Sequence, residues 1–216
     1  SPGEDGLLQS YFELLGVPFT GCDSYTSSIT FNKRDCISIL QKHDIPSANS
    51  VHLNIGDTIN ENEIIEKVGI PCFVKANKSG SSFGIYKVND RKDLTSSINN
   101  SFKIDNEVLI ESFLDGTEVS VGVMNYKNEI KVLGITQLIT ENDFFDYNAK
   151  YEGESKEITP ANISELQKNN VTKIAKKIYK KLGLKGFSRG EFIFIGDNPY
   201  FIEINSIPGM TNESIF

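Results

Sequence analysis

Near the end of the chain, two runs rich in β-branched and aromatic residues, Phe187–Ile195 and Pro199–Ile204, are separated only by Gly196-Asp197-Asn198. Runs of this composition favour strands, and a three-residue connection that contains Gly predicts a β-hairpin. Because the strands of a hairpin pair residue by residue, this feature constrains the fold more than any other stretch.

The register of the predicted hairpin decides which side chains share a face. With Asp197 at the centre, the cross-strand partners are Ile193 with Phe201, Glu191 with Glu203, and Arg189 with Asn205. Side chains alternate along a strand, so these six lie on one face. The other face is expected to be the core face, and it carries Phe192, Phe194, Ile202 and Ile204.

Two carboxylates, Glu191 and Glu203, are opposed in this register. Directly opposed like charges destabilise a sheet, so either one carboxylate is protonated or a cation lies between them. Asn205 adds a neutral oxygen, and such a hard-oxygen set is suited to magnesium. An exposed sheet face with ordinary charges is the alternative, and a register error of one residue would remove the pairing. The segment Ser206–Ser214, rich in small residues and loop breakers, would emerge beside this face and offer N–H groups to an anion.

Composition excludes several classes of function. The 216 residues suffice for one large domain or two small ones, and the net charge of −7 argues against non-specific nucleic-acid binding. Two histidines and three scattered cysteines show no zinc-like spacing, and the cysteines fit a reducing cytoplasm. The sequence has no apolar run of membrane-helix length and no signal peptide. Ser1–Gly6 resembles a loop that leads into a helix, so we expect residues upstream.

Helical and strand signals alternate without the strict repeat of a parallel sheet, which predicts an α+β fold. The expected helices are 7–15, 32–43 capped by Asn32, 60–67 capped by Asn60, one capped by Asp90, and 164–182 with a Ser164–Gln167 capping box. The other expected strands are 16–21, 71–75, 85–88 and 108–111, with a second hairpin, 118–126 and 129–138, around Lys127-Asn128. Residues 140–159 are expected to form a long loop, and two subdomains are expected to meet near 114–116.

Three further stretches can carry chemistry, although neither a Walker A loop nor a dinucleotide motif occurs. Lys75 precedes a Gly/Ser loop, 78–84, that can cover phosphates; like Lys33 at a helix start, it is also compatible with a solvated lysine. An apolar strand runs into acids at 108–118, which suits an adenine slot and a ribose but equally a plain strand and turn. Aromatic residues gather at 144–151, either as a lid over a ligand or packed back on the domain.

The string Phe201-Ile-Glu-Ile-Asn-Ser-Ile-Pro-Gly-Met-Thr211, preceded by Arg189-Gly190-Glu191, resembles the end of the ATP-grasp fold. It is most similar to the D-alanine–D-alanine ligases of cell-wall synthesis, and the resemblance covers roughly residues 30–216. The chain departs from the family in having Gly190 and Glu191 where Leu or Val and Asp are usual, so the carboxylate there is one methylene longer.

The resemblance implies a role for each matching residue. Lys33 and Lys75 would hold ATP phosphates under a loop containing Ser81 and Ser82, and Ser81 would also hydrogen-bond the active-site tyrosine. Adenine would lie against Glu111, Ser112, Phe113 and Leu114, with Glu118 on the ribose. Lys150 would contact the terminal phosphate and Tyr151 would sit over the substrates. Glu191, Glu203 and Asn205 would hold two magnesium ions, Arg189 and the Gly209 amide would stabilise the tetrahedral intermediate, and Ser214 would bind the second substrate.

The implied reaction is phosphorylation of one D-alanine by ATP, followed by attack of a second D-alanine on the acyl phosphate. ATP, two Mg2+ ions (or Mn2+) and D-alanine are the implied ligands, and neither nucleic acid nor a membrane is implied. The implied location is the cytoplasm. The oligomeric state stays open, with a homodimer among the options.

The implied domains are the tail of an N-terminal substrate domain at 1–29, a small ATP-grasp subdomain at 30–116, and a large one with the metal and substrate site at 117–216. A family N-terminal domain and a closing helix would extend the chain. A D-alanine–D-lactate or D-alanine–D-serine ligase, another carboxylate–amine ligase, and a non-catalytic nucleotide-binding fragment are the alternatives; Tyr151 favours D-alanine.

Overall fold

The computed structural model describes residues 3–80, 83–140 and 155–210. The chain divides into two compact units, which are described separately. The large unit comprises Ser1–Ser47, Gly116–Ile139 and Glu157–Phe216, and the small unit comprises Ala48–Asp115 and Thr140–Lys156. Residues 30–47 therefore group with the large unit, in contrast to the predicted range 30–116. None of the helices in the described ranges is long and apolar enough to cross a membrane.

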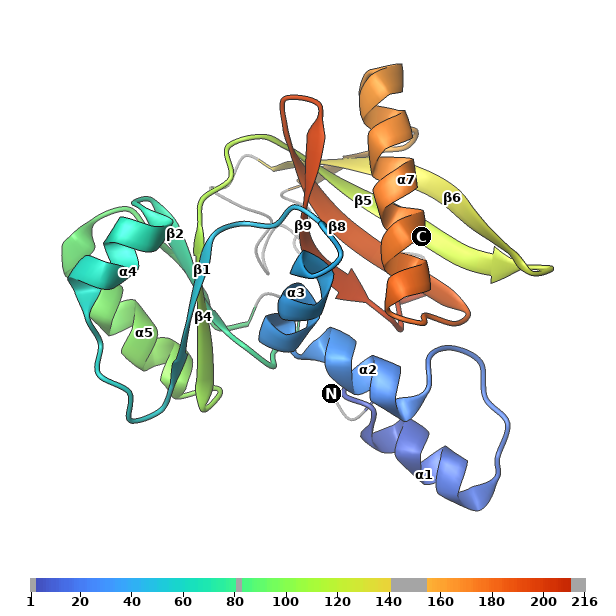
Figure 1. Cartoon of the computed structure of the whole chain (residues 1–216), viewed down its shortest axis with the longest axis horizontal. Helices are drawn as coiled ribbons and strands as arrows, with labels where there is room; N and C mark the ends of the chain where they lie inside the picture. Colours follow the sequence, from blue (N-terminus) through green and yellow to red (C-terminus); the bar gives the residue numbers. More distant parts are fainter. Residues whose placement is uncertain (1–2, 81–82, 141–154, 211–216) are drawn as a thin grey trace. The chain divides into compact units, whose positions relative to one another are not determined.

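The large unit is built on an antiparallel five-stranded sheet (Figure 1). Its order is β7-β6-β5-β8-β9, and its strands are β5 (Thr117–Tyr126), β6 (Glu129–Thr140), β7 (Ser155–Ile158), β8 (Phe187–Ile195) and β9 (Asn198–Asn205). Helix α7 (Glu165–Lys181) packs against β5, β8 and β9. The predicted Ser164–Gln167 capping box opens α7, and Gly183, with φ 66°, follows it. The prediction of a long loop at 140–159 is wrong for its last residues, because β7 forms there.

Three short helices precede this sheet: α1 (Leu7–Leu15), α2 (Ser24–Phe31) and α3 (Lys33–Gln41). The structure confirms α1 and the Asn32 cap of α3, whose side chain accepts a hydrogen bond from the Asp35 N–H. The strand predicted within 16–21 does not form. Helix α2 was not predicted. Helix α2 is rich in hydroxyl residues, which have no strong helix preference, so it depends on the Asp23 cap and on packing against α1, α3 and β9.

The β8–β9 hairpin forms, but its turn differs from the prediction. Ile195 pairs with Asn198, so the loop has two residues, and Gly196 with φ 61° takes the first of them, as type II′ turns favour. The register then shifts by one residue between Glu191 and Phe192. Strand β8 keeps a continuous register against β5, so the extra residue belongs to β9 and is a β-bulge.

The bulge changes which side chains of β9 face the core. Phe201 pairs with Phe192 rather than with Ile193, and the two buried rings lie 6.0 Å apart in an edge-on arrangement. Ile202, which was predicted to lie in the core, is only half-buried. The prediction failed here because one unpaired residue reverses the alternation of all side chains beyond it.

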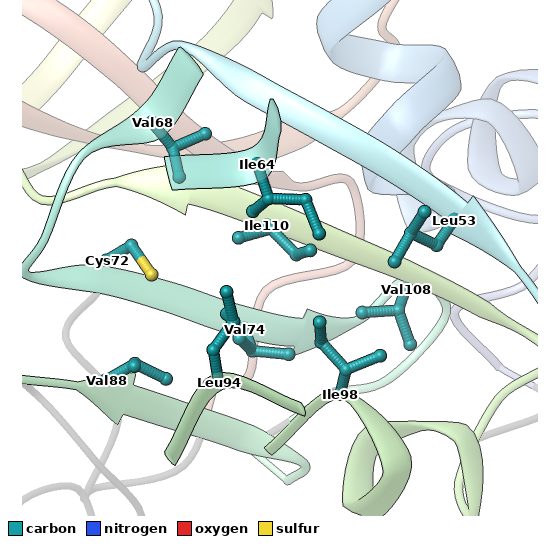
Figure 2. Close-up of a cluster of buried hydrophobic side chains, with 10 residues drawn as sticks. All are labelled: Leu53, Ile64, Val68, Cys72, Val74, Val88, Leu94, Ile98, Val108 and Ile110. Carbon is teal, nitrogen blue, oxygen red and sulfur yellow. The ribbon is translucent and has the colours of Figure 1, made fainter. Parts of the chain in front are cut away.

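The small unit is a second antiparallel sheet, of order β1-β4-β2-β3. Its strands are β1 (Ser50–Asn54), β2 (Cys72–Ala76), β3 (Ile85–Val88) and β4 (Glu107–Ser112), and its helices are α4 (Glu61–Val68), η1 (Arg91–Asp93) and α5 (Leu94–Phe102). Figure 2 shows Ile64 and Val68 of α4 and Leu94 and Ile98 of α5 gathered with strand side chains in one apolar core. The other face of this sheet carries Lys75 and Glu111 together with Phe73 and the buried Leu109.

Most local predictions for the two units are confirmed. The caps at Asn60 and Asp90 form, and Tyr126 pairs with Glu129 across Lys127 and Asn128, which both have positive φ. Strand β1 was not predicted. Helices and antiparallel sheets in both units confirm the α+β class.

Candidate functional site

The strand pairing on which the predicted metal site depends is present in the large unit. Glu191 pairs with Glu203 and Arg189 pairs with Asn205, although the turn and the bulge each differ from the prediction by one residue. The two differences cancel, so the register at this end of the hairpin is confirmed. Strand β5 continues the same face, because Ser120 pairs with Glu191 and Glu118 pairs with Ile193.

Two cations offset the two carboxylates. Arg189 donates from Nη2 to Glu191 Oε1 at 3.1 Å, and these side chains are only 14% and 5% exposed. Lys33 Nζ lies 4.0 Å from Glu203 Oε2, and the lysine side chain is 10% exposed. The structure therefore places a basic side chain beside each carboxylate.

The face also retains unused hydrogen-bonding capacity. Considering only the described residues, Arg189 Nε and Ser120 Oγ are buried without a hydrogen-bond partner. Buried polar atoms without partners are rare in folded proteins and call for an explanation. Ser120 pairs with Glu191, which is two residues from Arg189 on β8. Neighbouring polar atoms without partners are expected where a surface binds a polar ligand.

The donor set fits magnesium without forming a complete cage. Glu191, Glu203 and the amide oxygen of Asn205 are hard ligands, and magnesium is usually held by one or two carboxylates together with substrate phosphates and water. Within the described ranges, no group of three His, Cys, Asp or Glu residues is close enough to hold a metal alone. A two-carboxylate site that needs the substrate to complete it is consistent with both observations.

The chain after β9 is held close to this face. Asn205 Oδ1 accepts a hydrogen bond from the Ile207 N–H at 3.0 Å, which turns the backbone directly after the strand. Ser206 is buried and its hydroxyl lies 3.0 Å from that of Thr30. Gly209 follows within the described residues, whereas Ser214 lies outside them.

The small unit presents a second charged surface. Lys75 Nζ lies 2.6 Å from Glu111 Oε2, and the side chains are 11% and 5% exposed. The two residues are diagonal neighbours, since Lys75 pairs with Leu109 and Glu111 pairs with Phe73. Lys75 Nζ is also 5.6 Å from the centre of the Phe73 ring. A buried ion pair beside an aromatic ring can recognise a ligand that is both flat and polar.

Sequence reasoning missed Lys87 and Phe73. Lys87 Nζ lies 4.8 Å from the centre of the Phe113 ring, and Phe73 packs 6.0 Å from the same ring. Lys87 and Glu111 are both register partners of Phe73 and share its face. A lysine within the apolar run 85–88 was the available signal, because it marks the polar face of that strand.

The remaining predicted residues are distributed as follows. Ser112 Oγ accepts a hydrogen bond from the Asn49 N–H at 3.1 Å, and Phe113 and Leu114 are half-buried. Glu118 belongs to the large unit, whereas Glu111 to Leu114 belong to the small unit. Ser81, Ser82, Lys150 and Tyr151 lie outside the described residues.

Comparison with known proteins gives consistent results. A family model described as the D-ala D-ala ligase C-terminus matches residues 39–216. A D-alanine–D-alanine ligase of Flavobacterium johnsoniae is 59% identical over 215 residues, which is 100% of this chain and 67% of the relative.

Two crystal structures share the fold. That of the Bacillus anthracis D-alanine–D-alanine ligase complexed with ATP has a TM-score of 0.85 at 28% identity, over 99% of this chain and 67% of that one. That of the VanG D-Ala:D-Ser ligase of Enterococcus faecalis has a TM-score of 0.84 at 33% identity, over 98% and 62%.

The α+β units and these structural relatives define an ATP-grasp ligase fold, as the resemblance implied. The chain belongs to the D-alanine–D-alanine ligase family. It spans about two thirds of the length of the curated relatives that it matches.

Proposed function

We propose that this chain supports the ATP-dependent joining of two D-alanines through an acyl phosphate, as needed for peptidoglycan precursors. The observation that carries the proposal is the opposed pair Glu191 and Glu203, with Arg189 and Lys33 beside them. The relatives named as D-alanine–D-alanine ligases, one of them complexed with ATP, support it.

The family resemblance assigns ATP-binding residues within each unit. Glu111, which is buried against Lys75, offers an acceptor close to aromatic rings, which suits the edge of an adenine, with Ser112, Phe113 and Leu114 nearby in sequence. Glu118 would accept from the ribose. Lys33 and Lys75 would neutralise phosphate charge, because an ammonium group is an effective point charge for a phosphate.

Glu191, Glu203 and Asn205 would hold magnesium, and Mn2+ would suit the same oxygens. When bound, the metal would offset the charge that accumulates on the phosphoryl oxygens during transfer. Lys33 Nζ lies 4.0 Å from Glu203 Oε2, so a lysine proposed for a phosphate is a neighbour of a carboxylate proposed for the metal.

Arg189 would act in the second step. Attack of an amine on the acyl phosphate builds an oxyanion, and preorganised donors stabilise it strongly in a site that excludes water. Arg189 is held by Glu191 through Nη2, while its buried Nε is left without a partner among the described residues. The Gly209 amide would be the second donor. The family assigns Ser81, Ser82, Lys150, Tyr151 and Ser214 to the phosphates and substrates.

The second substrate is tested by phosphate release with D-alanine, D-lactate and D-serine in parallel. D-serine is the second candidate, because a D-Ala:D-Ser ligase is a structural relative. We expect release with D-alanine to exceed release with either competitor by about 10-fold or more, the discrimination that one hydroxyl or amine contact can give. A larger rate with D-serine would reassign the substrate, and nucleotide binding with no release in any arm would indicate a non-catalytic nucleotide-binding protein.

A further inference from the structure

Two buried hydroxyl groups connect helix α2 to the segment after β9. Thr30 Oγ1 lies 3.0 Å from Ser206 Oγ, and the two residues are 6% and 5% exposed. They are 176 positions apart in the sequence. Burial of a hydroxyl is costly unless it is hydrogen-bonded, and the contact with Thr30 satisfies the hydroxyl of Ser206.

The hydroxyl of Thr30 has several partners and only one proton. Its oxygen lies 2.9 Å from the Thr26 carbonyl, 3.0 Å from the Ser27 carbonyl and 3.0 Å from Ser206 Oγ. Thr30 is the donor in all three contacts, and a hydroxyl carries one proton, so the contact with Ser206 shares that proton with the two carbonyls of the helix. An isosteric valine at position 30 would remove all three contacts.

Helix α2, which carries Thr30, is held in place by contacts at its N-terminus. Lys185 donates from Nζ to Asp23 Oδ2 at 2.9 Å, and the Thr26 N–H donates to Asp23 Oδ1 at 2.9 Å. Burial acts to raise the pKa of Asp23, but these hydrogen bonds outweigh it and lower the pKa to about 2. Asp23 is therefore charged at neutral pH. Cys22 and Lys185 add reciprocal contacts, Sγ to carbonyl at 3.4 Å and N–H to Sγ at 3.3 Å.

Ser206 stands between the metal face and the predicted oxyanion donor. It directly follows Asn205, whose side chain already turns the backbone through the Ile207 N–H, and it precedes Gly209 by three residues. Asn205 restrains the segment on one side and Thr30 can restrain it on the other. These two contacts, together with the buried Pro208, restrain the backbone from Ile207 to Gly209.

We propose that Thr30 is a positioning residue, which holds Ser206 and thereby sets the Gly209 amide for stabilisation of the tetrahedral intermediate. This role rests on the proposed ligase function. Because an error of about 1 Å at a reacting centre costs roughly 100-fold, a partial release of this segment should cost on the order of 10-fold in kcat. ATP binding should change little, since Thr30 itself has no place among the ATP groups.

The test uses the enzyme carrying this sequence and four variants. Thr30→Val removes the hydroxyl, Thr30→Ser retains it, Ser206→Ala removes the partner, and Ser28→Ala changes an exposed residue of the same helix. Dipeptide formation gives kcat and the KM for ATP, and amide hydrogen exchange of residues 206–210 reports the segment independently of activity. We expect Thr30→Val and Ser206→Ala each to lower kcat by ~10-fold with the KM for ATP within about 2-fold, and to speed exchange.

The pattern among variants decides the proposal. Thr30→Ser should retain both wild-type kcat and slow exchange, Ser28→Ala should match the wild type, and the Thr30→Val/Ser206→Ala double variant should be no worse than either single one. Unchanged exchange in Thr30→Val would overturn the positioning role, as would faster exchange with unchanged kcat. A wild type that forms no dipeptide would instead contradict the proposed function, and the exchange data would still show whether Thr30 holds the segment.

Discussion

Glu203→Gln should lower magnesium-dependent dipeptide formation by ~100-fold or more, because loss of a metal carboxylate removes several kcal/mol of transition-state stabilisation. The fold should persist. Glu203 is 34% exposed and its contact with Lys33 is long, at 4.0 Å, so the free energy of unfolding should change by no more than about 1 kcal/mol. Steady-state kinetics over a magnesium titration, with urea unfolding, would measure both effects.

The matched control is Glu129→Gln in β6, which also removes a carboxylate from a weak ion pair of the same sheet. This variant should keep wild-type activity and stability. Full activity of Glu203→Gln would show that Glu203 is not a metal ligand. Unfolding of that variant would show that the carboxylate is needed for the hairpin itself.

Lys75→Met should cause the largest loss of stability. The lysine and Glu111 are nearly buried and in contact at 2.6 Å, so the variant leaves an uncompensated carboxylate in the small unit. Breaking one partner of a buried ion pair typically costs about 3–5 kcal/mol. Nucleotide affinity should fall as well, which calorimetry with a non-hydrolysable ATP analogue would measure beside denaturant unfolding.

Two variants separate stability from binding. Lys92→Met removes an ion pair with Asp90 in which the side chains are 74% and 54% exposed, and it should leave the free energy of unfolding almost unchanged. Lys75→Met/Glu111→Leu replaces the whole buried pair with apolar groups, which is often neutral, so stability should return while ATP affinity stays low. If Lys75→Met lowers the free energy of unfolding no more than Lys92→Met does, the ion pair between Lys75 and Glu111 is not the buried contact described here.

Local signals in the sequence predicted most elements but not the long-range pairings. Caps such as Ser164 and Asn32 identify helix starts because they satisfy backbone N–H groups within a few residues. The order β1-β4-β2-β3 brings together strands that are distant in sequence, so the Lys75–Glu111 contact could not be derived from spacing. Helix α2 was missed because its stability depends on Asp23 and on packing rather than on its composition.

The pairing of Glu191 with Glu203 shows how a correct register can follow from a hairpin whose turn was predicted incorrectly. A three-residue loop was expected, but the loop has two residues, and the bulge in β9 restores the predicted register at Glu191 and Glu203. Between the turn and the bulge, however, Phe201 is buried although it was expected on the face of Glu191. Ile202 is only half-buried although it was expected in the core. A bulge has no reliable local signature in one sequence, since it depends on how the strand packs.

Formation of an acyl phosphate can be tested with D-alanine labelled with heavy oxygen in its carboxylate, supplied with ATP and magnesium. One labelled oxygen should appear in the released phosphate for each dipeptide formed, because phosphate leaves with that oxygen when the second amine attacks the acyl carbon. Dipeptide formation with unlabelled phosphate, or ATP cleavage to AMP, would contradict this mechanism.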